Sequence, residues 1–374
     1  MKRLLFIFLI LSLKSFGQED TEVVFNSIKE ALVNPTIVKS LNLSDQKLSS
    51  LPADIIKLTN LEKIDMGENP DLDLVQAFNV LKQISSLKIL WLDEGKIRKI
   101  PDNISLLNNL EELSLSENEL TQFPEPIKHL KKLKELCLFS NKIKNVSFKK
   151  GELPNLIDID LCYNEFYTFP VELSVLPNLR RIIIWYNTIS VIPKSIKQFK
   201  KIEEINLQSN NLTSLPKQFG RLKTIQKLCL RDNKLSDTSI EVIYGLYNLK
   251  DLDLQGNNIT VLSDKVANLK QLERLSVCDN PLKELPSELE QVKTIQQLGL
   301  GDLHNLKWTN AFSIMEKLPN LKRVGMYTMK LPTMPTGFDK LQQVDTFWLT
   351  FNSFDNNEKK RIQEMVPKAK IDFE

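Results

Sequence analysis

The chain has few of the residues that usually carry enzyme chemistry. Histidine occurs only at His129 and His304 among 374 residues, and no cysteine stands at a register compatible with either one. Glycine is also scarce, with 11 residues, and no glycine-rich loop that could cradle a phosphate is present. Because a nucleophile–base pair and a His/Cys cluster at metal-ligand spacing are both missing, the sequence predicts no catalytic residue, no metal and no cofactor, and hence no enzyme.

An excess of charge of one sign is missing too. The 50 Lys and Arg residues nearly balance the 47 Asp and Glu residues, for a formal net charge of +3. This balance argues against a nucleic-acid-binding protein and against a polybasic membrane protein.

Long apolar runs are absent apart from a short one at the N-terminus. Lys2 and Arg3 precede an almost wholly apolar stretch over residues 4–13, and Ser15 and Gly17 then supply small residues before Gln18. The apolar stretch is shorter than the roughly 20 residues that a bilayer-spanning helix needs. The pattern is typical of a signal peptide over 1–17. It predicts a secreted or periplasmic protein with no membrane association after cleavage, and a buried first helix is the alternative.

A 23-residue period runs from Val38 almost to the C-terminus. One copy comprises Leu110, Leu113, Leu115, Asn118, Leu120, Phe123, Pro124, Ile127 and Leu130. Copies begin at residues 38, 61, 87, 110, 133, 156, 179, 202, 225, 249, 272, 295 and 321, with a partial copy at 344. Such self-similarity predicts a solenoid over 38–354, built of 13 repeats plus a partial one, in which each repeat buries the leucines of its neighbour.

Two repeats and both ends depart from this pattern. The 26-residue repeats at 61 and 295 share an apolar segment, beginning at Leu74 and Trp308, whose spacing predicts a short convex helix. Helical spacing over 21–33 predicts a helix within an N-terminal cap over 18–37. Residues 355–374 predict a C-terminal cap made of a helix and a short strand.

The spacing L-x-x-L-x-L-x-x-N-x-L, with endings such as Leu51-Pro52-x-x-Ile55, resembles the leucine-rich-repeat family. The 23-residue subtype is similar to exported bacterial members and to Ras-binding scaffolds. The resemblance implies an α/β horseshoe with a parallel sheet on its concave face, short helices or irregular segments on its convex face, and helical caps at both ends. It also implies binding mostly through the concave face. The chain departs from the consensus asparagine at Gln46, Gly95, Leu303 and Met329.

Aromatic residues are enriched at the repeat positions that should face the concave solvent, namely the third, fifth, seventh and eighth. Strand side chains alternate between the two faces of a sheet, and the repeat leucines take the inner face. The aromatic residues at these positions are Trp91, Phe139, Tyr163, Trp185, Tyr186, Tyr327, Trp348 and Phe351. Exposed aromatics beside an arginine are typical of a binding hot spot. The predicted ligand-binding residues are Phe139, Tyr163, Ile183, Trp185, Tyr186, Arg181, Asp160 and Trp91.

Two alternatives stay open for this surface. Strands favour aromatic residues for structural reasons, and Trp348 and Phe351 are also placed to pack against the C-terminal cap. Acidic residues dominate the concave positions of the repeats before 179, which favours a basic protein or peptide partner, although a solvated acidic face is the simpler interpretation. The cysteines are predicted to be free, because Cys137 and Cys162 should lie about 8 Å apart, beyond the usual disulfide limit of about 7 Å.

The sequence therefore predicts a non-catalytic, exported scaffold, monomeric, that binds a protein or peptide and no nucleic acid. An intracellular signalling scaffold of the Ras-binding type is the alternative, and it requires that the N-terminus remain uncleaved.

Overall fold

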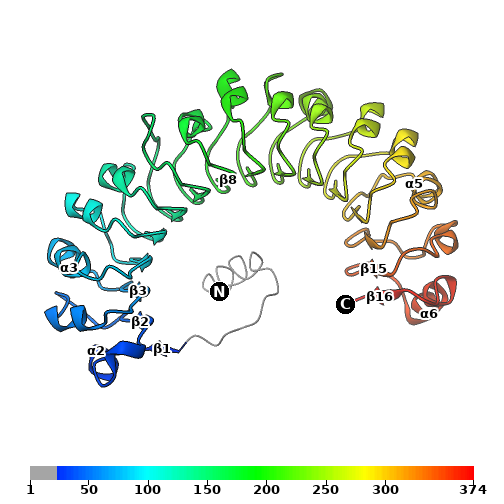
Figure 1. The fold of residues 1–374 in the computed structure, drawn as a ribbon. Coiled ribbons are helices and arrows are strands. Elements are labelled where there is room, and N and C mark those ends of the chain that lie inside the picture. The colour runs from blue at the N-terminus through cyan, green and yellow to red at the C-terminus, as the bar shows by residue number, and fades with distance from the viewer. Residues whose placement is uncertain (1–22) are drawn as a thin grey trace.

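The computed structural model describes residues 23–374, which form one horseshoe-shaped solenoid (Figure 1). The predicted signal peptide over 1–17 and residues 18–22 of the predicted cap lie outside the described residues. Strands line the inner, concave side of the horseshoe, and short helices lie on its outer, convex side. Within the described part, no helix has the length and apolar character needed to cross a bilayer.

The strands form a single 16-stranded sheet in which each strand pairs with the next one along the chain. All strand pairings in this sheet are parallel, and they join equivalent repeat positions, such as Leu113 with Leu136 and Leu298 with Val324. The predicted parallel solenoid is therefore confirmed. The strands are β1 Val24–Phe25, β2 Ser40–Asn42, β3 Lys63–Asp65, β4 Ile89–Trp91, β5 Glu112–Ser114, β6 Glu135–Cys137, β7 Asp158–Asp160, β8 Arg181–Ile183, β9 Glu204–Asn206, β10 Lys227–Cys229, β11 Asp251–Asp253, β12 Arg274–Ser276, β13 Gln297–Gly299, β14 Arg323–Gly325, β15 Thr346–Trp348 and β16 Lys370–Asp372.

Most outer segments are single turns of 3₁₀-helix, and longer α-helices occur where the repeats are longer. Both helices predicted from the 26-residue repeats are confirmed, as α3 and α5. The α-helices are α2 Ile28–Ala31, α3 Leu74–Leu81, α4 Asp237–Ile240, α5 Trp308–Met315 and α6 Asn356–Met365. The 3₁₀-helices are η1 Pro35–Ile37, η2 Ala53–Lys57, η3 Asp102–Leu106, η4 Glu125–His129, η5 Val171–Val175, η6 Lys194–Gln198, η7 Phe219–Arg221, η8 Glu241–Gly245, η9 Asp264–Asn268, η10 Ser287–Gln291 and η11 Phe338–Lys340.

The N-terminal cap differs from the predicted helix over 21–33. Val24 and Phe25 form strand β1, which pairs in parallel with β2, and only Ile28–Ala31 is α-helical. The physical reason is the open edge of β2, whose unpaired backbone groups are satisfied by an added strand. Ser27 then caps the short helix by accepting a hydrogen bond from the Glu30 backbone N–H.

Buried asparagines connect successive repeats at the ends of the strands. The Asn164 side-chain amide donates to the carbonyls of Leu138, Leu161 and Cys162 and accepts from the Ile143 backbone N–H at 2.9 Å. Equivalent bonds recur along the array, so the turn backbone is hydrogen-bonded although it is buried. We call this series the asparagine ladder; its buried members are Asn69, Asn118, Asn141, Asn164, Asn187, Asn210, Asn233, Asn257 and Asn280.

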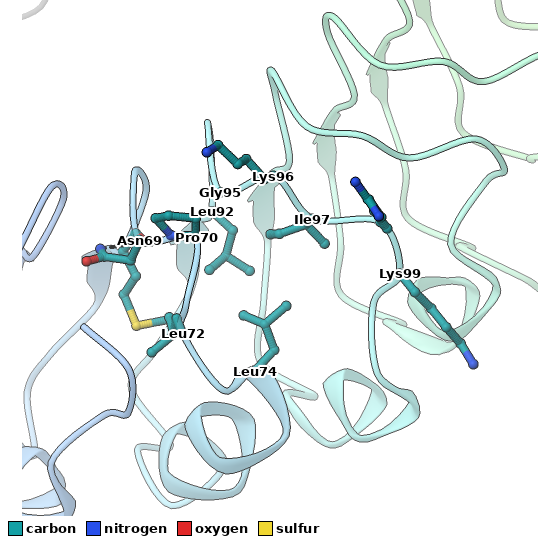
Figure 2. A pocket seen from close by; sticks show the side chains of 11 residues that line it. Asn69, Pro70, Leu72, Leu74, Leu92, Gly95, Lys96, Ile97 and Lys99 are labelled. Atoms are coloured by element: carbon teal, nitrogen blue, oxygen red, sulfur yellow. Dashed lines mark hydrogen bonds between the residues drawn. The ribbon is translucent and has the colours of Figure 1, made fainter. Parts of the chain in front are cut away.

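Two interruptions of the ladder have different structural consequences. Beside Gly95, which supplies no side-chain amide, lies a hollow of about 120 Å³ lined by apolar side chains such as Leu72 and Leu92 and by the cationic Lys96 and Lys99 (Figure 2). At Leu303 the backbone N–H instead lies 3.2 Å from the sulfur of Met329, which takes the place of the amide oxygen. The strand register is unchanged on both sides of the second interruption.

Candidate functional site

One backbone position on the concave rim is strained in every repeat. The residue that precedes the ladder position has a positive φ throughout, at Asp45, Glu68, Glu94, Glu117, Ser140, Tyr163, Tyr186, Ser209, Asp232, Gly256, Asp279, Asp302, Thr328 and Phe351. Glycine and short polar residues tolerate this left-handed conformation best, whereas bulky side chains rarely adopt it. The bulky side chains of Tyr163, Tyr186 and Phe351 therefore make this backbone conformation less favourable and lower the local stability.

Two of these strained tyrosines belong to a compact group of four rings. Tyr163 and Tyr186 stack with ring centroids 4.5 Å apart and planes inclined by 6°. Trp185 packs edge-on against both tyrosines, at 5.0 and 5.2 Å, and Phe139 packs against Tyr163 at 5.2 Å. We call Phe139, Tyr163, Trp185 and Tyr186 the aromatic cluster. It spans the three consecutive repeats whose strands are β6, β7 and β8.

The aromatic cluster is accessible from the concave side. Tyr186 is 46% exposed and Tyr163 is 38% exposed, whereas Phe139 and Trp185 are half-buried. Paired aromatic rings are ordered before a partner arrives, so binding costs them less conformational entropy. The arrangement can therefore supply a rigid apolar anchor.

Ile183 was predicted to line this surface, and that prediction is wrong. Its side chain is only 2% exposed, although it lies outside the leucine core, so neighbouring side chains on the concave face cover it. Cys162, also at an outward position, is fully buried in the same way. Alternation along the strand gives the direction of these side chains correctly, but it does not show that larger neighbours cover them.

Arg181 is bound to carboxylates of both flanking strands. Its guanidinium lies 2.5 Å from Asp158 on β7 and 3.5 Å from Glu204 on β9. The two carboxylates hold the half-buried side chain in place and neutralise its charge. Arg181 therefore sits beside the aromatic cluster as a fixed support.

Asp160, beside the aromatic cluster, and Asp93, in an earlier repeat, have carboxylates that are poorly solvated. Burial raises the pKa of Asp160 to about 6. Hydrogen bonds from Cys162 lower this pKa, but their effect is smaller than that of burial. Burial likewise raises the pKa of Asp93 to about 6, although its carboxylate accepts hydrogen bonds from the Ser114 hydroxyl and the Ser116 backbone. A carboxylate that lacks water gains from a nearby cation, so this part of the face favours positively charged groups.

Trp91 lies apart from the aromatic cluster and has a different environment. Among residues 23–374 it forms no aromatic ring pair. Its indole N–H donates to Glu112 at 2.8 Å, and the Lys63 ammonium lies 3.5 Å from the ring centroid. Lys63 is not among the predicted site residues, although its outward third position on the adjacent strand places it beside Trp91.

All four cysteines are free thiols, and their environments do not favour reactivity. Burial raises the pKa of Cys137 and Cys162 well above the ordinary value, and it raises that of Cys229 to about 12. A protonated thiol is a weak nucleophile. In the described part of the chain, no group of three or more His, Cys, Asp or Glu side chains could hold a metal ion.

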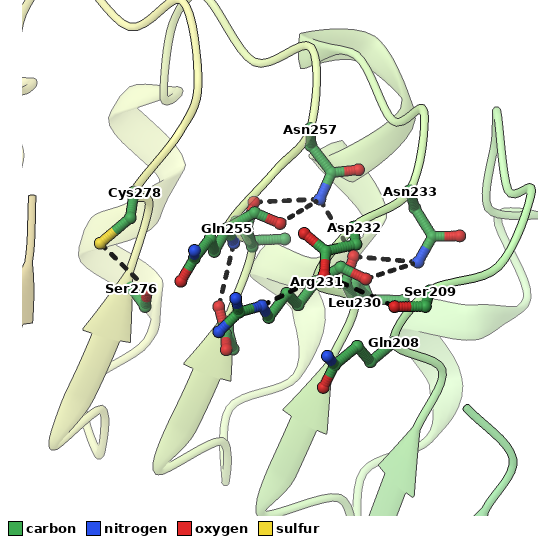
Figure 3. A network of polar contacts seen from close by, with 12 residues as sticks. Gln208, Ser209, Leu230, Arg231, Asp232, Asn233, Gln255, Asn257, Ser276 and Cys278 are labelled. Atoms are coloured by element: carbon green, nitrogen blue, oxygen red, sulfur yellow. Dashed lines mark hydrogen bonds and ion pairs between the residues drawn. The ribbon is translucent and has the colours of Figure 1, made fainter. Parts of the chain in front are cut away.

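Beyond the aromatic cluster, the concave face becomes polar (Figure 3). Arg231 lies 3.3 Å from Asp232, and the ladder amides of Asn233 and Asn257 bond to the backbone just above it. Further along, the Tyr327 hydroxyl reaches Cys278 at 3.1 Å, with its ring over Gly301. The exposed apolar surface of the central repeats is thus bordered by polar groups.

Comparisons with known proteins agree with this architecture. A family model described as a leucine rich repeat matches residues 85–143, 177–235 and 223–282. No curated protein matches the chain. An internalin, InlF, from Listeria monocytogenes is 20% identical with a TM-score of 0.59, and the match covers 85% of this chain and 82% of that one. A chain of the Toll–Spätzle complex of Drosophila is 19% identical with a TM-score of 0.63, covering 85% and 44%.

A solved leucine-rich-repeat protein of Leptospira interrogans is more similar than these two. It is 30% identical with a TM-score of 0.72, and the match covers 94% of this chain and the whole of that protein. The repeat spacing, the parallel sheet, the asparagine ladder and this full-length similarity lead to one conclusion: the chain belongs to the leucine-rich-repeat family.

Proposed function

We propose that the protein is a non-catalytic, exported scaffold that binds a protein or peptide on its concave aromatic cluster. The observation that carries the proposal is the pair of stacked, exposed tyrosines, Tyr163 and Tyr186, in left-handed backbone. Strained residues persist where they serve a purpose other than local stability. Toll in complex with Spätzle and the plant receptor RGFR1 in complex with RGF2 are relatives in fold whose structures contain a partner.

The acidic residues of the preceding strands give the partner its expected character. Asp93, Glu135, Asp158 and Asp160 all have pKa values raised by burial, and only Asp158 among them contacts the Arg181 guanidinium. A partner with an apolar or aromatic anchor for the cluster and basic side chains toward β4–β7 fits this face.

Substitution of the cluster tests the proposal. Protein carrying Trp185→Ala and Tyr186→Ala is compared with wild type and with Tyr247→Ala, a control that removes an exposed aromatic outside the concave face. All three serve as bait in medium from the native source, and a partner held by wild type and control is then titrated calorimetrically. We expect the double variant to lose at least about 2 kcal/mol of binding free energy.

Retained affinity in the folded double variant would remove the aromatic cluster from the binding site. Export is tested separately, by N-terminal sequencing of the protein from its native source. The proposal expects a mature start near Gln18, and an intact Met1 in the functional protein would contradict export.

A further inference from the structure

The outer side of two adjacent repeats lacks the acidic residue that the other outer turns carry. The 3₁₀-helices η6 and η7 have no acid in their first turn. An acidic side chain in the first turn interacts favourably with the partial positive charge of a helix N-terminus. Helices η6 and η7 lack this small stabilising interaction. The other outer 3₁₀-helices from η2 to η11 each have an acidic residue in their first turn, at Asp54, Asp102, Glu125, Glu172, Glu241, Asp264, Glu288 and Asp339.

The same outer surface is strongly basic, and its cations are not paired. We call Lys194, Lys197, Lys200, Lys201, Lys217, Arg221 and Lys223 the basic outer patch; all are exposed. None of them forms an ion pair with any residue of the described 23–374. Lysines of later repeats differ, because Lys265 pairs with Glu241 at 2.7 Å and Lys317 with Glu290 at 2.6 Å.

Nearby acids do not neutralise the basic outer patch. Between residues 182 and 231 the only acids are Glu203 and Glu204, at the start of inner strand β9. Glu203 pairs with Arg180, and Glu204 pairs with Arg181 and Lys227, so both are committed to the concave side. The outer surface of these repeats therefore presents positive charge alone.

Part of the basic outer patch surrounds an open hollow. Lys197, Gln198, Lys200 and Arg221 line a depression of about 340 Å³ between the adjacent turns η6 and η7. At the edge of the patch, Tyr247 is 56% exposed, with the Lys223 ammonium 4.2 Å from its ring centroid. Tyrosine is typical of surfaces that meet lipid headgroups, because its ring is apolar and its hydroxyl polar.

We propose that the basic outer patch binds the surface of an anionic lipid bilayer, in contrast to the sequence-based expectation of no membrane association after cleavage. Clusters of four to eight Lys and Arg residues are typical of surfaces that bind anionic lipids. The lysines of this convex surface form no ion pairs within the described part of the chain, so their charge is available to a flat layer of laterally mobile headgroups. Nucleic-acid grooves are usually entered by arginines and stacking aromatics, and this patch has a single arginine. The acidic concave face is repelled by the same bilayer, so it would point away from the membrane toward its partner.

Vesicle binding by the full-length protein tests this proposal. Vesicles of phosphatidylcholine with or without 30% phosphatidylglycerol are sedimented at about 0.1 M salt. We expect binding to the anionic vesicles only, with loss at about 1 M salt, where the screening length falls to roughly 3 Å. Each basic side chain near such a surface raises partitioning about fivefold, so Lys197→Gln/Lys200→Gln/Arg221→Gln should lower it at least about thirtyfold.

A matched control removes the same charge elsewhere. Lys265→Gln/Lys307→Gln/Lys317→Gln replaces outer lysines that are paired with acids, and we expect partitioning within about threefold of wild type. Circular dichroism establishes that both variants fold. Equal losses in the two variants, or wild-type binding to duplex DNA with none to anionic vesicles, would overturn the proposal. Because the concave face is unaltered in both variants, this outcome is independent of the partner-binding test.

Discussion

At the scale of single residues, the left-handed rim position separates residues that tolerate a positive φ from bulky residues that are strained by it. Most repeats place an acid, serine or glycine there, which the backbone accepts at modest cost. Tyr163 and Tyr186 recover part of the cost through ring contacts with each other and with Trp185. Phe351 is 76% exposed and forms no ring pair within the described residues, so its strain is not offset.

Replacing Phe351 by asparagine should therefore stabilise the protein. A left-handed backbone costs an L-residue about 1–2 kcal/mol, and asparagine tolerates it better than phenylalanine. We expect Phe351→Asn to raise the free energy of unfolding by about 0.5–1 kcal/mol in urea titrations. Phe351→Ala, which removes the ring but keeps the strain, should change it by less than about 0.3 kcal/mol. If alanine stabilises as much as asparagine, exposed apolar surface and not backbone strain is the cause.

The candidate site was only partly predictable from the sequence at this scale. The excess of aromatics at outward positions located Tyr163, Trp185 and Tyr186, because strand alternation alone determines the side toward which they point. The burial of Ile183 and the double ion pair of Arg181 depend on the sizes and rotamers of neighbours on other strands. A repeat pattern contains no such information.

At the scale of elements, the asparagine ladder connects one repeat to the next. Its amides bond the backbone of two repeats at once, as Asn164 does with Leu138 of the preceding repeat and Leu161 of its own repeat. Removing one amide leaves buried backbone groups without partners, and each unsatisfied group costs about 1–3 kcal/mol.

We expect Asn164→Ala to lower the free energy of unfolding by about 2–4 kcal/mol in urea titrations. Asn211 provides the control, because its side chain lies beside the ladder and accepts only from the Lys234 ammonium at 3.0 Å. Asn211→Ala should cost less than about 0.5 kcal/mol. Similar losses of unfolding free energy in the two variants would mean that a ladder amide stabilises the array no more than a surface asparagine does.

The helices and strands within the repeats could be predicted from the repeat pattern, whereas those at the N-terminal end of the solenoid were harder to predict. Helices α3 and α5 follow from apolar spacing within longer repeats, and the strands follow from the leucine positions. Helical spacing around Val24 predicts a helix, but the structure has a strand there. The open edge of β2 decides for a strand, and that edge exists only in the folded solenoid.

At the scale of the whole molecule, folding separates charges that the sequence intermixes. The formal net charge of +3 describes neither face, because acids gather on the concave side of the first repeats and unpaired lysines on the outer side of η6 and η7. Crowding and burial on the concave side raise the pKa of Asp65, Asp93, Glu135, Asp158 and Asp160. Ionising these buried acids therefore lowers the free energy of unfolding.

That cost predicts a pH dependence with a definite sign. Burial raises the pKa of Asp93 and Asp160 from the ordinary 3.8 to about 6, so between pH 4 and 6 the folded state holds protons that the unfolded state has released. Their contribution to stability thus falls as the pH rises through this window and stays low above it.

The variant Asp93→Asn/Asp160→Asn keeps the oxygens that accept from Ser116 and Cys162 but cannot ionise. We expect it to be more stable than wild type by about 2 kcal/mol at pH 7.5 and equal to it at pH 4, as measured by urea unfolding. A variant less stable at pH 7.5 would show that the folded protein already stabilises these carboxylates as anions. A gain at pH 7.5 would mean that the native chain keeps two acids that weaken it, and the basic partner proposed above would account for their retention.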